Sequence, residues 1–127
     1  MTTIKQLCSL SADDIQTKLD GMFDNVHDYY EFLFDRLSTV VRYEASILQY
    51  NKVLKSEHSK EEMEEADRQR HITHNAVIDA MRMLNRLCAK LELPPLVKPE
   101  YTEQDALRRM CALSSFEILE NAMRYLP

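Results

Sequence analysis

Two arginines and two histidines lie close together in the segment RQRHITHN, residues 68–75. A histidine can give or accept a proton near neutral pH, and an arginine beside it can stabilise a developing negative charge. His74, Arg70 and Arg68 could therefore form the centre of an acid–base site. Whether they do depends on what the rest of the chain brings to this segment.

The segment belongs to a predicted long helix that begins after Ser59. Ser59 and Glu62 form an S-x-x-E capping box, in which the serine oxygen accepts a hydrogen bond from the free N–H three residues later. The helix ends at LELPPLVKP, because adjacent prolines cannot extend it. Between these ends the inner face recurs in steps of three and four residues, as Met63, Ala66, Arg70, His74, Val77, Met81, Leu84, Cys88 and Leu91.

A second long helix is predicted just before the first, because apolar residues recur there every seven positions. These residues are Val26, Leu33, Val40, Ile47 and Leu54. The stripe is broadened on one side by Phe34, Val41 and Leu48, and on the other by Tyr29, Tyr43 and Tyr50. A stripe of this width predicts contact with more than one neighbour.

The two long helices should form an antiparallel hairpin, since only the short segment KSEHSKEE joins them. If the turn centres in this segment, residues whose numbers add up to about 115 lie at the same level. Glu44, which interrupts its own apolar stripe, then comes level with Arg70, His71 and His74. His71 lies one turn from Asp67, and we expect these two side chains nearer to solvent.

Two interpretations of this layer stay open. In the first, Glu44 is a buried carboxylate paired with Arg70, and the layer only fixes the register of the helices. In the second, His74 is a general acid or base in a site that also contains Arg70, Arg68, Glu44 and Tyr43. We favour the first interpretation and expect the layer to be mostly closed.

The segment from Arg68 to His74, RQRHITH, also fits the pattern R-x(4–6)-H and resembles the signature of the HEPN superfamily. The resemblance implies a small helical bundle that dimerises, with Arg68 and His74 facing each other across the dimer. They would act on the 2′-hydroxyl and phosphate of RNA without metal. The chain departs from the commoner form, because Gln69 follows the arginine where a residue such as Asn is usual, and five residues intervene rather than four.

Two further helices are predicted outside the hairpin. A short one should start after Ser11 and end near Gly21, since glycine weakens a helix interior. A third long helix should start after Thr102, with an inner face of Leu107, Met110, Cys111, Ser114, Ile118, Ala122 and Tyr125. The expected fold is all-α, an antiparallel up-and-down bundle of three long helices plus a shorter N-terminal helix, forming a single domain over residues 1–127.

Composition restricts the classes of function. A single glycine among 127 residues excludes glycine-rich phosphate loops. The net charge of −5 disfavours nucleic-acid binding, and the chain has no apolar run long enough for a membrane span. Three cysteines without C-x-x-C spacing and four scattered histidines predict no disulfide, no metal and no cofactor. We expect a cytoplasmic protein.

The function that follows by elimination is a non-enzymatic module for protein interaction or self-association. It would bind a protein partner, or a second copy of itself, through the broad face of the helix from Val26 to Leu54. The alternative is a HEPN-like metal-independent ribonuclease or a ligand-binding bundle, with Arg68, Arg70, His74 and Glu44 at its centre and Tyr43 beside them.

Overall fold

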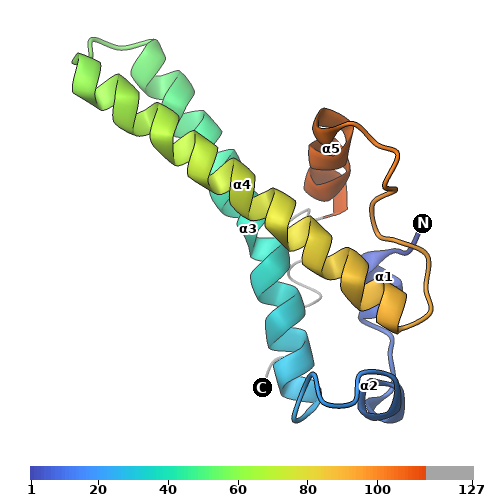
Figure 1. Cartoon of the computed structure of the whole chain (residues 1–127). Helices are drawn as coiled ribbons and strands as arrows, with labels where there is room; N and C mark the ends of the chain where they lie inside the picture. The colour runs from blue at the N-terminus through green and yellow to red at the C-terminus, as the bar shows by residue number, and fades with distance from the viewer. Residues whose placement is uncertain (114–127) are drawn as a thin grey trace.

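The computed structural model describes residues 1–113, and the regular structure in this range is entirely helical. Two long helices form an antiparallel hairpin, and three shorter ones pack against it (Figure 1). The helices are α1 (Ile4–Leu7), α2 (Ala12–Lys18), α3 (Val26–Leu54), α4 (Lys60–Lys90) and α5 (Glu103–Leu113). The predicted all-helical class and the two long helices are confirmed.

Helices α2, α4 and α5 begin at the caps that the sequence predicts, and α3 begins at Asn25 in the same way. In each case a side-chain oxygen accepts a hydrogen bond from the backbone N–H three residues later, at 2.9 to 3.2 Å. The four capping residues are Ser11, Asn25, Ser59 and Thr102. The single turn of α1 was not predicted. It is capped by two reciprocal hydrogen bonds between Thr3 and Gln6.

The core lies at one end of the hairpin, where α1 and α2 cover it (Figure 1). Two tyrosines of α3 join this end to the α1 turn, because Tyr29 donates a hydrogen bond to the Leu7 carbonyl at 2.6 Å and Tyr30 donates one to the Cys8 carbonyl at 3.0 Å. The side chains with no more than 1% exposure in the hairpin at this end are Tyr29, Leu33, Leu37, Val40, Val77, Leu84, Leu87 and Cys88.

The chain leaves α4 through a tight turn and a fixed linker. The N–H of Leu93 donates to the Cys88 carbonyl at 2.9 Å, and Glu92 has a φ of 59°, the left-handed conformation that usually favours glycine after a helix. The Asn85 amide then clamps the linker to α4, accepting from the Val97 N–H at 3.1 Å and donating to the Val97 carbonyl at 3.0 Å. These contacts set the start of α5.

The described part of α5 crosses the hairpin instead of lying along its full length. Its first residue, Glu103, pairs with His74 of α4, and Cys111, two turns later, lies within electrostatic reach of Glu44 of α3. The predicted third long helix is therefore confirmed only as the segment Glu103–Leu113. The predicted inner-face positions Ser114, Ile118, Ala122 and Tyr125 lie outside the described residues.

The hairpin therefore has two parts with different surroundings. We call residues 26–40 and 77–90 the base, and residues 41–76, which include the turn, the arm. In the arm only Ala66 is buried, and Figure 1 shows the arm extending beyond α5. Four large apolar side chains of the arm are exposed: Val41 at 50%, Leu48 at 70%, Leu54 at 54% and Ile72 at 52%.

Within residues 1–113, no helix combines the length and the apolar character needed to cross a membrane.

Candidate functional site

His74 lies where three helices meet. Its Nε2 is 2.8 Å from a carboxylate oxygen of Glu103 on α5, and its Nδ1 is 3.3 Å from the side-chain oxygen of Asn75. The ring of Tyr43 on α3 stands edge-on to the imidazole, with 6.0 Å between the ring centroids. Among residues 1–113, the His74–Glu103 pair is the one ion pair that joins two different helices, which makes it an electrostatic attachment of α5 to the hairpin.

Glu44 faces α5 and not the arginines of α4. The side chain of Glu44 is exposed. The pKa of the Cys111 thiol is raised first by the burial of Cys111 and second by the negative charge of the Glu44 carboxylate. The neighbouring Tyr43 also has a raised pKa, because of burial first and the Cys111 thiolate second, while the positive charge of Arg70 opposes the shift. The junction of α3, α4 and α5 thus contains a tyrosine, a thiol, a histidine and two carboxylates.

Arg70 is held by one contact within α4 and one contact with α3. Its guanidinium lies 2.5 Å from Asp67 and 4.1 Å above the ring centroid of Tyr50. The predicted pairing with Glu44 is therefore wrong, and so is the closed layer of Glu44, Arg70 and His74. Each of these three residues has a different partner.

The reason for this error is a shift in the register of the hairpin. The hydroxyls of Ser46 and Thr73 are 2.7 Å apart across the two helices. The predicted register placed Ser46 level with Gln69, which lies one helical turn away from Thr73. This displacement moves Arg70 from the level of Ala45, next to Glu44, to the level of Gln49, next to Tyr50.

The remaining predicted residues point to solvent and pair locally. Arg68 is 65% exposed and forms an ion pair with Glu65. His71 is 69% exposed and lies 3.5 Å from Asp67, so its predicted position near solvent is confirmed. Arg68 and His74 therefore have separate partners within one chain.

The junction has few of the features of a catalytic pocket. Both ring nitrogens of His74 face an oxygen of a neighbouring side chain. A cavity of about 200 Å³ between α4 and the linker includes Glu103 and Tyr101 in its lining, but not His74. Within residues 1–113, no three His, Cys, Asp or Glu side chains gather in a way that could hold a metal ion.

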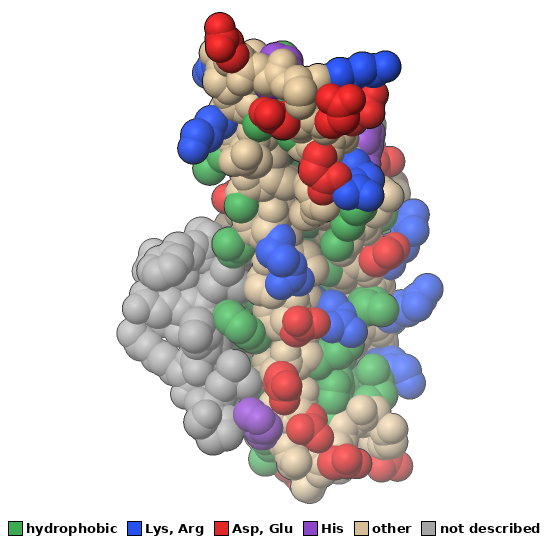
Figure 2. Space-filling model, turned by 90° about the vertical axis from the view of Figure 1, so that its left-hand side faces the viewer, with side chains coloured by type: hydrophobic (Ala, Val, Ile, Leu, Met, Phe, Trp, Pro, Cys, Tyr) green, Lys and Arg blue, Asp and Glu red, His purple; other side chains and the backbone are tan. Residues whose placement is uncertain are grey.

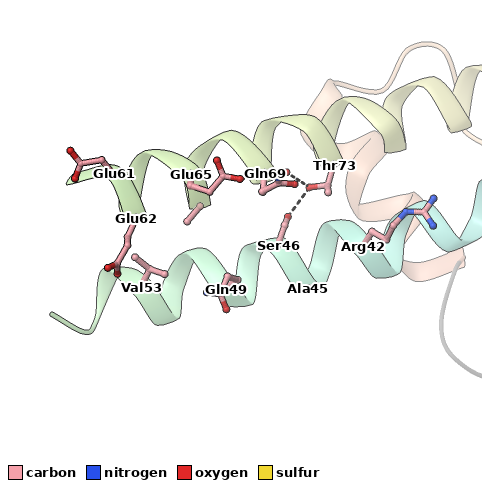
Figure 3. A pocket seen from close by; sticks show the side chains of 11 residues that line it. Arg42, Ala45, Ser46, Gln49, Val53, Glu61, Glu62, Glu65, Gln69 and Thr73 are labelled. Carbon is pink, nitrogen blue, oxygen red and sulfur yellow. Dashed lines mark hydrogen bonds between the residues drawn. The ribbon is translucent and has the colours of Figure 1, made fainter. Parts of the chain in front are cut away.

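The larger hollow lies along the arm, in a place that the sequence analysis did not predict. It is a groove of about 780 Å³ lined by α3 and α4 alone, and the close-up in Figure 3 shows its two walls. Its lining is Arg42, Ala45, Ser46, Gln49, Val53, Glu61, Glu62, Glu65, Ala66, Gln69 and Thr73. The signal in the sequence was the run of small side chains at helical spacing, Ala45 and Ser46 on one helix and Ala66 on the other.

A family model described as "Protein of unknown function (DUF3232)" matches residues 1–121. The chain belongs to the DUF3232 family. No curated protein and no solved structure matches it. Membership of DUF3232 carries no activity with it, so the function has to be argued from the junction and from the groove.

Of these two features, the groove has the character of a binding surface. The junction is occupied by its own side chains, which pair with one another and hold α5 in place. The groove is open and is formed by the part of the hairpin that no other described helix covers (Figure 3).

Proposed function

We propose that this DUF3232 protein is a non-enzymatic helical module that binds another protein through the arm of its α3–α4 hairpin. The observation that carries the proposal is the exposure of the arm. Residues 41–76 bury one side chain, Ala66, while Leu48 is 70% exposed and Ile72 is 52% exposed. Large apolar side chains that stay exposed on a helical surface are typical of a protein interface.

The residue types on the arm support the same conclusion. Tyrosine and arginine are enriched at the centres of protein interfaces, where they combine large contact area with hydrogen-bonding groups. In the arm, Tyr50 and Arg70 are stacked on each other, and Arg70 is further fixed by Asp67. A partner would therefore meet side chains that are already ordered, which reduces the entropy lost on binding.

A photo-crosslinking experiment tests the proposal. A benzophenone amino acid is placed at Leu48 in the arm and, as a matched control, at Asp79, which is exposed on the α4 surface of the base. After irradiation in cells, we expect discrete adducts at Leu48 and none at Asp79. Equal labelling at the two positions, or no adduct at Leu48, would reject a binding role for the arm.

A further inference from the structure

The groove on the arm is lined in part by small side chains. Ser46 of α3 lies opposite Thr73 of α4, with 2.7 Å between their hydroxyls, and Ala45 and Ala66 also line the groove. Small side chains allow another pair of helices to approach closely. From Arg42 to Val53 the α3 wall is about 17 Å long at 1.5 Å per residue, the length of roughly three helical turns.

The two ends of the groove carry opposite charges. Arg42 lines the end nearer the base, and the acidic residues Glu61, Glu62 and Glu65 line the end at the tip (Figure 3). Figure 2 shows that charged side chains also crowd around the tip itself. A ligand that follows the groove therefore meets a positive end and a negative end.

Arg42 has no carboxylate partner within residues 1–113. Its guanidinium contacts the hydroxyl of Ser38 at 3.4 Å, and none of the nine ion pairs of the described residues includes it. Glu61 and Glu62 take part in none of these ion pairs either. The charges at both ends of the groove are thus available to another molecule.

We infer that the occupant of this groove is a second copy of the chain, packed antiparallel on the first about a two-fold axis. The inference rests on the proposed binding role of the arm and names its partner. In the antiparallel arrangement the Arg42 end of each groove faces the Glu62 end of the other, so the attraction occurs twice. A parallel arrangement would place like charges together at both ends.

The charge pattern is the reason for choosing a second copy over an unrelated helix. An isologous dimer requires a surface that is complementary to itself after reversal, and a groove with one basic and one acidic end meets that requirement. The two arms together would form a four-helix arrangement that covers Ala45 and Ala66 on each side. Two helices about 10 Å wide and about 17 Å long give a small contact, so we expect a dimer of micromolar affinity.

Charge reversal tests this directly. Sedimentation velocity is measured from about 10 to about 500 micromolar for the native chain and for the variants Arg42→Glu and Glu62→Arg. The native chain should dimerise, and each variant alone should dimerise at least tenfold more weakly, because like charges then meet at both ends. An equimolar mixture of the two variants should recover the native affinity, since every contact between unlike variants is again attractive.

Two further variants serve as controls for folding and for net charge. Lys52→Glu changes the charge of α3 by the same amount as Arg42→Glu. Glu64→Arg changes the charge of the first turns of α4 by the same amount as Glu62→Arg. Neither Lys52 nor Glu64 lines the groove. Both should dimerise as the native chain does. Recovery in the mixture also shows that the two test variants are folded.

A native chain that stays monomeric, or a mixture that does not recover, would overturn the inference. The proposed function is tested separately, by the photo-crosslinking experiment at Leu48. If Leu48 forms adducts with another protein and the chain stays monomeric, the arm binds a different partner and only the second-copy inference falls. If neither dimer nor adduct forms, both fall.

Discussion

The base and the arm are built from the same two helices, yet they differ in what covers them. Leu33, Leu37, Leu84 and Leu87 of the base are fully buried, because α1, α2 and α5 pack around them. In the described chain α5 touches the arm near the base, at Glu44 and His74, and Ala66 is the single buried residue of the arm. The difference shows that most of the buried core lies in the base, whereas the arm keeps large apolar side chains exposed.

The largest expected effect separates the two regions with one type of substitution. Leu37→Ala in the base should lower the free energy of unfolding by about 2 to 5 kcal/mol, because it leaves a cavity among fully buried side chains. Leu48→Ala in the arm should change it by less than about 0.5 kcal/mol, since Leu48 is 70% exposed. Urea denaturation followed by circular dichroism gives both values. Similar losses would mean that the arm is part of the core.

A smaller effect should come from removing a tyrosine hydroxyl in each region. Tyr29→Phe leaves the buried carbonyl of Leu7 without its donor, which should cost about 1 to 2 kcal/mol of stability. Tyr50→Phe keeps the ring on which Arg70 stacks and should be nearly neutral. The same denaturation experiment compares them. A neutral Tyr29→Phe would show that the α1 turn does not need this hydrogen bond.

The sequence predicts the helices well because their signals are local. Ser11, Asn25, Ser59 and Thr102 each lie next to the N–H groups that they cap, so no knowledge of distant contacts is required. The signal for the end of α4 is also local, because two adjacent prolines follow it closely in the sequence. The one-turn helix α1 was missed because four residues are too few to show a periodic apolar face.

The division into base and arm could not be predicted, because the apolar repeat does not change between them. Leu33 in the base and Ile47 in the arm occupy equivalent positions of the same seven-residue repeat, but only Leu33 is fully buried. Burial here depends on where α1, α2 and α5 pack, which is a long-range property of the chain.

The candidate site failed for a related reason. The partner of Arg70 depends on the register of the hairpin, whereas Glu44 and His74 both contact α5. The sequence of the turn fixes its position only to within about one turn. The role of Glu103 could not have been found either, since it follows from the path of the linker that Asn85 clamps to α4.

The reactivity of two thiols, Cys8 and Cys111, should differ because their surroundings differ. Burial raises the pKa of Cys8, at the end of α1 and packed against the base, to about 11, so this thiol should resist alkylation near pH 8. Cys111 is only half-buried and should react first. Glu44→Gln removes a negative charge that raises the pKa of Cys111, so the thiolate fraction should increase and alkylation should become about two- to fivefold faster.

The measurement is iodoacetamide labelling of the folded protein, followed by peptide mass spectrometry. Glu31→Gln is the matched control, because Glu31 is an exposed glutamate of α3 that pairs with His27 in the base. It should leave the rate at Cys111 unchanged. If Glu44→Gln has no effect either, the carboxylate does not act on the thiol and α5 crosses the hairpin elsewhere.

The smallest expected effect concerns His74, the residue with which a catalytic interpretation would begin. His74→Ala removes a pair whose glutamate is 64% exposed, so it should cost no more than about 1 kcal/mol of stability, and less at high salt.

Arg68 and His74 have separate partners, so we expect no RNA cleavage that depends on either residue. The measurement is an RNA cleavage assay in the presence of chelator with the native chain, Arg68→Ala and His74→Ala. His27→Ala is the control. Cleavage that is lost in His74→Ala and kept in His27→Ala would make the junction a nuclease site and the arm its dimer contact.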